Sequence, residues 1–256
     1  MAEAWRLVTT WGGDPGWNMA LDEALLLAPG DGGEGPPVTV RVYTWAPDTL
    51  SLGYFQRLAD VPPAAAFLGQ PAPAGTPVPG AVVRRLTGGG AIHHARELTF
   101  SLSAPADHPL YRGPVAASYG RVHAALAEAL AELGARAEVR ADKVPASEAA
   151  GTGMCFHVSS PVDLVWQDRK GVGSAQRRTG GRVLHHGSIK LGPTALDTDV
   201  ASLPLEDPRE LAPLVLGALA RRAGATLEPG EPTDAERAAA EARAPHFTSE
   251  AFLRRR

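Results

Sequence analysis

The stretch richest in chemically active residues is VRRLTGGGAIHH at positions 83–94, where two arginines precede three glycines and two histidines. Arginine carries a permanent charge and a planar set of donors that suits phosphate or carboxylate groups. Consecutive glycines let the backbone come close to a ligand and adopt positive φ values. The segment is therefore predicted to be a binding loop for a substrate with an acidic or acyl head. The same residues also allow a glycine-rich hairpin turn with surface arginines.

A second glycine-bearing segment, RKGVGSAQRR, starts at Arg169 and follows a predicted strand. The ammonium of Lys170 would point along the backbone of this segment, where small residues again permit a close approach by a ligand. The structural alternative is a hairpin turn over positions 168–171 with solvated charges. The small residues concerned include Gly171, Gly173, Ser174 and Ala175.

Cys155 is the only cysteine, and it lies in the sequence GTGMCF. A single cysteine is usually a small buried hydrophobic residue, but the glycines here place it on a loop or a strand edge. The strand predicted over 162–167 and the turn after it let Lys170 face Cys155 across a hairpin. A nearby ammonium stabilises the thiolate, which is the reactive form of the side chain. Cys155 is therefore a candidate nucleophile.

The histidines include two adjacent pairs, His93-His94 and His185-His186, each on a strand-like segment. Alternation along a strand sends the members of a pair to opposite faces, so one of each pair is expected at a site. A zinc site needs about three converging ligands. With one cysteine and no His-x3-His or Cys-x2-Cys spacing, no metal site is predicted. A histidine that orients a carbonyl or a backbone turn fits the pattern better.

Alternating and helical patterns indicate an α+β chain in which a mixed β-sheet core is flanked by helices. Asp14-Pro15 marks the start of the first helix, and Thr233 and Glu236 form a capping box for a later one. Loops are expected up to Pro37 and over the proline-rich run 61–80, which leaves room for one short helix. Strands are predicted at 5–9, 38–45, 49–54, 81–86, 97–103, 135–140, 162–167 and 183–191, and helices at 15–28, at 119–133 and through most of the last third.

Composition excludes several classes of protein. The 256 residues carry 25 basic and 28 acidic side chains, a net charge of −3 that argues against a general nucleic-acid surface. No run of 18 apolar residues indicates a membrane span, and the first residues do not have the pattern of a signal peptide. One cysteine cannot form an intrachain disulfide. These observations predict a soluble, cytoplasmic protein that binds neither nucleic acid nor membrane.

Several motifs together resemble the lipoate-protein ligase and octanoyltransferase superfamily. The resemblance implies a biotin/lipoate protein ligase catalytic domain, related in fold to class II aminoacyl-tRNA synthetases, over residues 1–205. Residues 206–256 would then form a helical segment packed on it. The motifs appear in the family's order as NMALDE from Asn18, SLGYFQ from Ser51, RRLTGGGAIHH from Arg84, ELTFS from Glu97, KGVGSAQ from Lys170 and HGSI from His186.

Two chemistries exist in that superfamily. Ligases activate free lipoate with ATP and magnesium, whereas octanoyltransferases move octanoate from acyl carrier protein to a lysine of a lipoyl domain. The acceptor would be a glycine cleavage H protein or a 2-oxoacid dehydrogenase E2 subunit. Cys155, 15 residues before Lys170, resembles the nucleophile of the cysteine-dependent transferases, which use no cofactor. The resemblance implies that Lys170 stabilises the thiolate and helps to move the proton of the acceptor amine.

The resemblance also implies a set of substrate-binding residues and two departures from the family pattern. Gly90 stands where the transferases often have arginine, and Ala95 stands where an aspartate usually orients the motif histidine. An ATP-dependent ligase and a non-catalytic binder of acyl groups or carrier proteins therefore remain alternatives. The implied substrate-binding residues are Arg85, Gly88, Gly89, Gly90, His94, Gly173, Ser174, Ala175 and His186.

Overall fold

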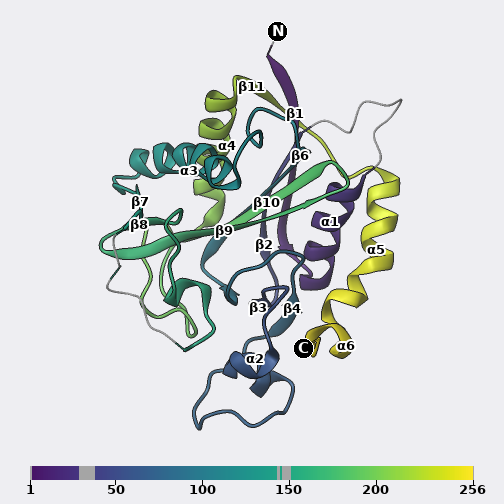
Figure 1. The fold of residues 1–256 in the computed structure, drawn as a ribbon, viewed down its shortest axis with the longest axis vertical. Coiled ribbons are helices and arrows are strands. Elements are labelled where there is room, and N and C mark those ends of the chain that lie inside the picture. The colour runs from purple at the N-terminus through teal and green to yellow at the C-terminus, as the bar shows by residue number, and fades with distance from the viewer. Residues whose placement is uncertain (1, 29–37, 143–144, 146–150, 256) are drawn as a thin grey trace.

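A computed structural model describes residues 2–28, 38–142, 145 and 151–255 of the chain. The loop predicted up to Pro37 lies mostly outside these residues. Within them, a large mixed sheet forms the centre of the molecule and a small sheet lies beside one end of it (Figure 1). The predicted α+β class with a mixed sheet flanked by helices is confirmed. In the part of the chain that is described, no helix combines the length and the hydrophobicity needed to span a membrane.

The large sheet has the strand order β11-β1-β2-β6-β10-β9-β8-β7. β1 runs parallel to both of its neighbours, and the other pairs are antiparallel. β9 and β10 form a long hairpin that carries the second glycine-bearing segment into the centre of the sheet. The strands are β1 (Glu3–Gly13), β2 (Thr39–Trp45), β6 (Glu97–Pro105), β7 (Glu138–Val139), β8 (Leu164–Trp166), β9 (Arg169–Thr179), β10 (Arg182–Lys190) and β11 (Ala225–Pro229).

The small sheet has the order β4-β3-β5 and holds the first glycine loop. β3 (Thr49–Leu52) pairs in parallel with β4 (Ala81–Arg84) and antiparallel with β5 (Ile92–His94). The glycines lie in the connection between β4 and β5, so both ends of that loop are held by β3. A short helix α2 (Pro62–Phe67) lies in the proline-rich run, which agrees with the loop and short helix predicted there.

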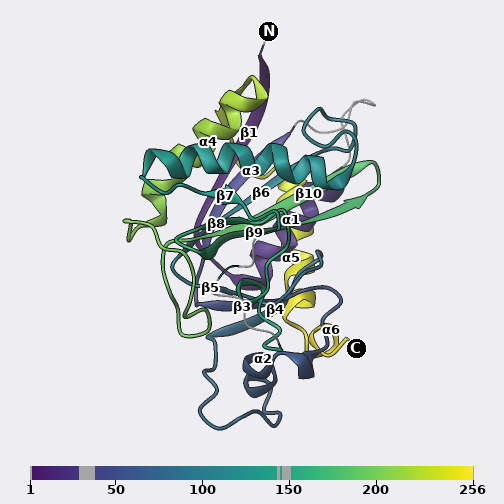
Figure 2. The same ribbon diagram turned by 60° about the vertical axis from the view of Figure 1, so that its left-hand side comes forward.

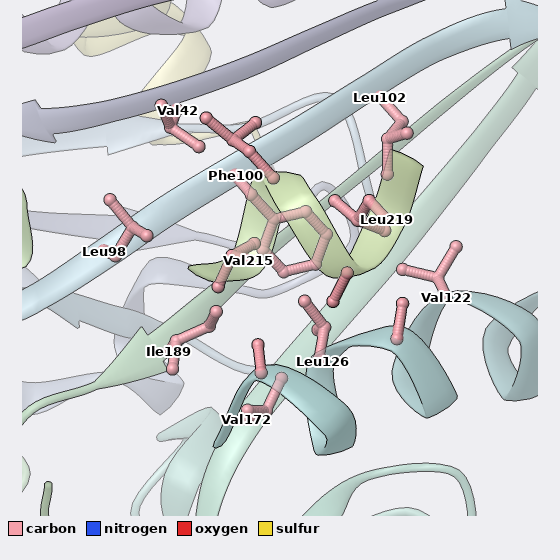
Figure 3. Close-up of a cluster of buried hydrophobic side chains, with 14 of the residues drawn as sticks. Val42, Leu98, Phe100, Leu102, Val122, Leu126, Val172, Ile189, Val215 and Leu219 are labelled. Atoms are coloured by element: carbon pink, nitrogen blue, oxygen red, sulfur yellow. The ribbon is translucent and has the colours of Figure 1, made fainter. Parts of the chain in front are cut away.

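Helices cover both faces of the large sheet. α3 (Val115–Glu132) and α4 (Pro208–Ala223) cover one face, and Figure 2 shows α3 lying across it. α1 (Pro15–Leu27) packs on the other face, with α5 (Asp234–Thr248) alongside it and the short α6 (Glu250–Leu253) after α5. Figure 3 shows the core under α3 and α4, where buried side chains from strands and helices interlock, among them Phe100, Val172, Ile189, Val122, Leu126, Val215 and Leu219.

The helix starts follow local chemistry that the sequence predicts. The Asp14 carboxylate accepts a hydrogen bond from the Trp17 amide at 2.9 Å, and proline occupies the first position of α1. Thr233 and Glu236 form the predicted capping box at the start of α5. α3 begins earlier than predicted, at Val115, and its C-terminal end is followed by a glycine with a φ of 78° at Gly134.

Three expectations about the elements are wrong. Residues 225–229 are not helical, because they pair with β1 as the edge strand β11. The strand predicted over 135–140 is reduced to Glu138–Val139. The turn expected over 168–171 is instead centred on Gln167 and Asp168, whose φ values are 53° and 56°, so Lys170 belongs to a strand. The division of the chain at residue 205 stays a prediction.

Candidate active site

The thiol of Cys155 lies next to the ammonium of Lys170. Cys155 begins a single 3-10 turn, Cys155–His157, and is partly exposed. The Lys170 side chain reaches it from β9, with 3.4 Å between Nζ and Sγ. The same Nζ donates to the backbone carbonyl of Cys155 at 2.8 Å and to that of Val158 at 3.1 Å. The predicted meeting of the two side chains across the β8–β9 hairpin is therefore present.

Lys170 is held as a buried cation, 2% exposed. Its Nζ forms an ion pair with Asp163 Oδ2 at 2.8 Å. Burial alone lowers the pKa of Lys170, but the neighbouring charges of Cys155 and Asp163 outweigh burial and raise that pKa above its usual value. The side chain is therefore a fixed positive charge at neutral pH. The alternative prediction, in which Lys170 is a solvated residue of a hairpin turn, is wrong, because Lys170 lies in β9 and its side chain is buried.

The segment that carries Cys155 docks directly against the first glycine loop. The Cys155 amide donates to the Ala91 carbonyl at 2.7 Å, and the Ala91 amide donates to the Gly153 carbonyl at 2.8 Å. A Cβ at position 90 would lie 2.8 Å from the Cys155 nitrogen and 2.9 Å from its Cα. The cysteine segment can therefore pack this closely because residue 90 is a glycine and has no side chain.

Gly90→Ala is expected to reduce the rate of the reaction at Cys155 by about tenfold to a hundredfold, since a displacement near 1 Å at a reacting group has this effect. The added methyl must push the cysteine segment away from the loop. Gly88→Ala is the matched comparison, because its methyl would meet only the Phe55 ring at 3.8 Å. Steady-state rates of the two variants test this expectation, and equal losses would contradict it.

The two arginines of the first loop are structural anchors. Arg85 is 2% exposed, and its guanidinium donates to the carbonyls of Ser51, Gly88 and Gly90 at 2.9, 2.7 and 2.7 Å. Burial lowers the pKa of Arg85 to about 10, so it remains charged at neutral pH. Arg84 donates from the opposite side of β4 to the Phe252 carbonyl at 2.8 Å and so ties α6 to the small sheet. Of the pair, Arg85 faces the site, as predicted, but its donors hold the loop.

Cys155 and the first glycine loop line a cavity with about 400 Å³ of empty space, part of which is open to solvent. The cavity brings together most of the residues that the resemblance implied, and Lys170, Gly90 and Gly173 lie directly behind its wall at Cys155. Its lining residues are Met19, Tyr43, Trp45, Ser51, Arg85, Gly88, Gly89, Ile92, His94, Thr99, Cys155, Ser174, Ala175, His186 and Gly187.

His94 is oriented by a carboxylate that the motif comparison did not assign to it. Its Nδ1 donates to Glu97 Oε1 at 2.6 Å, and its Nε2 accepts from Ser51 Oγ at 2.8 Å. Glu97 is buried, yet Lys190 and His94 hold the pKa of its carboxyl far below the usual value, although burial alone would raise it. Glu97 thus supplies the orientation that an aspartate at position 95 usually gives. The doubt raised by Ala95 about the placement of His94 is resolved in this way.

His186 is oriented by a second buried carboxylate. Its Nδ1 lies 3.3 Å from Asp22 Oδ2, and its Nε2 lies 2.6 Å from the Thr87 hydroxyl at the start of the glycine loop. Asp22 is also paired with Arg41 at 3.0 Å. Burial alone would raise the pKa of Asp22. The hydrogen bond to His186 and the charge of Arg41 outweigh burial and hold this pKa below its usual value, so the carboxylate stays ionised. This network holds His186 in place in the cavity wall.

The other member of each histidine pair faces away from the cavity, as strand alternation predicts. His93 bonds to Asp48 and Thr194 outside it. His185 lies under α3, where its Nε2 is 3.0 Å from Ser174 Oγ, and His123 Nε2 is 2.6 Å from the same oxygen. The hydroxyl of Ser174 is therefore held by two buried imidazoles, while the residue itself lines the cavity.

The first glycine loop carries backbone amides beside the cavity, which Gly88 and Gly89 line. Among the residues described, no acceptor is found for the amides of Gly88, Gly89 and Gly90. Amide groups directed at a reacting carbonyl are the usual means of stabilising an oxyanion.

Over the same described ranges, no cluster of three or more His, Cys, Asp or Glu side chains suits a metal ion.

Sequence reasoning missed the residues that hold the reacting groups in place. Asp163 anchors Lys170, Asp22 and Arg41 orient His186, and His123 reaches Ser174. None of them lies in a glycine-rich motif. The signal that was available is that Asp22 lies in the first motif, NMALDE, where a carboxylate on an apolar helix face needs a buried partner.

The chain resembles known proteins over most of its length. The lipoyl protein ligase A/B catalytic domain family matches residues 14–201. Octanoyltransferase LipM of Moorella thermoacetica is 45% identical over 194 residues, which are 74% of this chain and 66%, just under two thirds, of that protein. Octanoyltransferase LipM of Kyrpidia tusciae is 35% identical over an alignment of 269 positions, gaps included, that covers 93% of this chain and 94% of that protein.

Solved structures show the same fold. A bi-partite lipoate protein ligase from Thermoplasma acidophilum, studied with its E2 lipoyl domain, superposes with a TM-score of 0.74 at 16% identity, covering 100% of this chain and 98% of that chain. Lipoate-protein ligase A bound with ATP gives a TM-score of 0.73 at 18% identity and covers 99% of both chains. The chain therefore belongs to the lipoyl protein ligase A/B catalytic-domain family and, within it, to the octanoyltransferase LipM group.

Proposed function

We propose that this protein transfers an octanoyl group from octanoyl-acyl carrier protein, through a thioester on Cys155, to a lysine of a lipoyl domain. The observation that supports this most strongly is the 3.4 Å approach of Lys170 Nζ to Cys155 Sγ, since Cys155 lines the cavity. A thiolate beside a fixed ammonium is an activated nucleophile. Met19, Trp45 and Ile92 give the cavity an apolar lining, which suits the chain of an acyl substrate.

In the first half-reaction the Cys155 thiolate attacks the carbonyl carbon of the donor thioester. The new carbon–sulfur bond replaces the bond to the carrier, whose thiolate leaves and takes a proton from solvent. The two thioesters are close in energy, so the exchange needs no ATP and no cofactor. The amides of Gly88 and Gly89, which line the cavity and have no acceptor among the described residues, would donate to the oxyanion of the tetrahedral intermediate.

In the second half-reaction the neutral amine of the acceptor lysine attacks the acyl-Cys155 carbonyl. The carbon–nitrogen bond forms and the carbon–sulfur bond breaks, the amine gives up its proton to solvent, and the Cys155 thiolate leaves toward Lys170. The raised pKa of Lys170 favours a fixed cation that stabilises the leaving thiolate over a residue that releases and takes up protons. The acceptor would be the lipoyl domain of a glycine cleavage H protein or of a 2-oxoacid dehydrogenase E2 subunit.

An ATP-dependent lipoate ligase is the second candidate, because the solved structures of this fold include lipoate protein ligases. The two functions are separated by an assay with purified octanoyl-acyl carrier protein, a lipoyl domain and no nucleotide. The transferase should modify the lipoyl domain by one octanoyl group without ATP. A chain that modifies the domain only with free lipoate, ATP and magnesium, and that releases pyrophosphate, would instead be a ligase. Binding of carrier protein without any modification would indicate the non-catalytic alternative.

A further inference from the structure

A second hollow, which we call the arginine groove, lies outside the glycine loop. It is open to solvent and is lined by Arg177 of β9, Arg243 of α5, Arg255 and Tyr54, together with Leu86 from the start of the glycine loop. Tyr54 links the groove to that loop, because its amide donates to the Thr87 carbonyl at 2.8 Å. The groove and the active-site cavity are therefore neighbours on the two sides of one loop.

The arginine groove concentrates positive charge in a chain whose net charge is −3. The guanidinium carbons of Arg177 and Arg255 lie 5.3 Å and 4.2 Å from the centre of the same Tyr54 ring. Glu23 is the one carboxylate among the described lining residues, and it pairs with Arg243 at 2.6 Å.

The remaining charges of the groove are not compensated within the described residues. No carboxylate in that part of the chain forms an ion pair with Arg177 or Arg255. His246 also lines the groove, but burial and the charge of Arg243 lower its pKa, so its ring is neutral at neutral pH. Two guanidiniums that face one ring without an acid between them are suited to an anionic ligand.

The groove lies at a defined distance from the nucleophile. A Cβ at Gly173 would be 3.4 Å from Cys155 Sγ, so the sulfur lies beside this position of β9. Arg177 lies four residues further along β9, on the same face as Gly173 and Ala175 because side chains alternate. At about 3.4 Å per residue the separation along the strand is roughly 14 Å.

We propose that the arginine groove binds the phosphate at the base of the donor's phosphopantetheine arm, an inference that rests on the proposed function. About thirteen bonds separate the phosphorus from the sulfur of that arm. Four to five residues of extended backbone contain the same number of bonds and span roughly 15 Å, so the extended arm has about this length. An arm with its phosphate between Arg177 and Arg255 thus carries its thioester to Cys155. The phosphate accepts hydrogen bonds from both guanidiniums.

The sign of the charge favours the donor over the acceptor as the occupant. The reacting group of the acceptor is a lysine, which approaches as an ammonium and is repelled by Arg177 and Arg255. A lysine side chain is also short, so the acceptor must contact the mouth of the cavity itself. The donor alone has an anionic group separated from its reacting carbonyl by a long arm.

Binding of free 4′-phosphopantetheine, measured by calorimetry on the Cys155→Ala variant, tests the proposal without any chemistry. The affinity should exceed that for pantetheine, which lacks the phosphate, by at least about tenfold, the range expected for charge-assisted hydrogen bonds. The additional changes Arg177→Ala and Arg255→Ala should remove this difference. Arg136→Ala is the control, because Arg136 is exposed and lies outside the groove. Equal affinities for the two compounds would overturn the proposal.

A kinetic arm uses the wild-type protein with octanoyl-acyl carrier protein and with octanoyl-pantetheine. Arg177→Ala should lower kcat/KM for acylation by the carrier about tenfold and leave acylation by octanoyl-pantetheine unchanged. Equal losses with both thioesters, or a loss confined to transfer onto the lipoyl domain, would contradict the assignment to the donor phosphate. If octanoyl-acyl carrier protein does not acylate the wild type at all, the proposed function fails, while the binding measurement still decides on the groove.

Discussion

Cys155→Ala is expected to lower the rate of octanoyl transfer to a lipoyl domain by at least about a thousandfold, because no other thiol exists in the chain to carry the acyl group. The fold should be retained, since the side chain is small and partly exposed. Its sulfur makes one hydrogen bond, with Lys170 at 3.4 Å. Steady-state transfer, with thermal unfolding measured on the same samples, checks both expectations.

Cys155→Ser is the matched control for this variant. It keeps a polar atom near Lys170, but a serine hydroxyl is not ionised at neutral pH and is a weak nucleophile without a base. Its rate should be as low as that of the alanine variant. Activity within tenfold of the wild type in either variant would mean that the amine attacks the bound acyl group directly, as in a ligase.

Lys170→Met is expected to slow acylation of Cys155 by about two to three orders of magnitude, because the thiolate loses the cation that stabilises it. The variant should also be less stable. Asp163, 2.8 Å from Nζ in the wild type, would be left as an unpaired buried carboxylate, which costs roughly 3–5 kcal/mol. Single-turnover acylation with octanoyl-acyl carrier protein and denaturant unfolding measure the two effects.

The double variant Lys170→Met/Asp163→Asn separates stability from chemistry. Removing the carboxylate removes the unpaired charge, so the free energy of unfolding should partly recover while the acylation rate stays low. Recovery of the rate in the double variant would show that Lys170 acts only by neutralising Asp163.

The contribution of Lys170 to the free energy of unfolding should depend on pH. Because the pKa of Lys170 is raised in the folded state, this contribution is complete at neutral pH and is lost only as the pH rises through the raised pKa.

The glycine loops could be predicted from the sequence because their function depends on local backbone freedom. Gly88, Gly89 and Gly90 lie in one segment, and the cavity beside them lies where the motif comparison implies. Histidine pairs were also assignable, since alternation along a strand decides which member faces the site. His94 and His186 line the cavity, whereas His93 and His185 do not.

The supporting residues could not be predicted in the same way, because their partners are distant in sequence. Glu97 is three residues from its partner His94, but Lys190, the cation that pairs with it, comes from β10. Arg85 has the residue type of a ligand-binding group, yet its donors are directed to backbone carbonyls once β3 and β4 pair. The edge strand β11 is not predicted because none of its five residues is fully buried, and pairing with β1 decides its conformation.

The most direct test of the account is the intact mass of the wild-type protein after brief incubation with octanoyl-acyl carrier protein and no acceptor. The mass should increase by one octanoyl group, the adduct should map to the peptide that contains Cys155, and hydroxylamine should remove it, as expected for a thioester. A protein that stays unmodified while it still converts a lipoyl domain, or an adduct that forms equally on Cys155→Ala, would contradict the account.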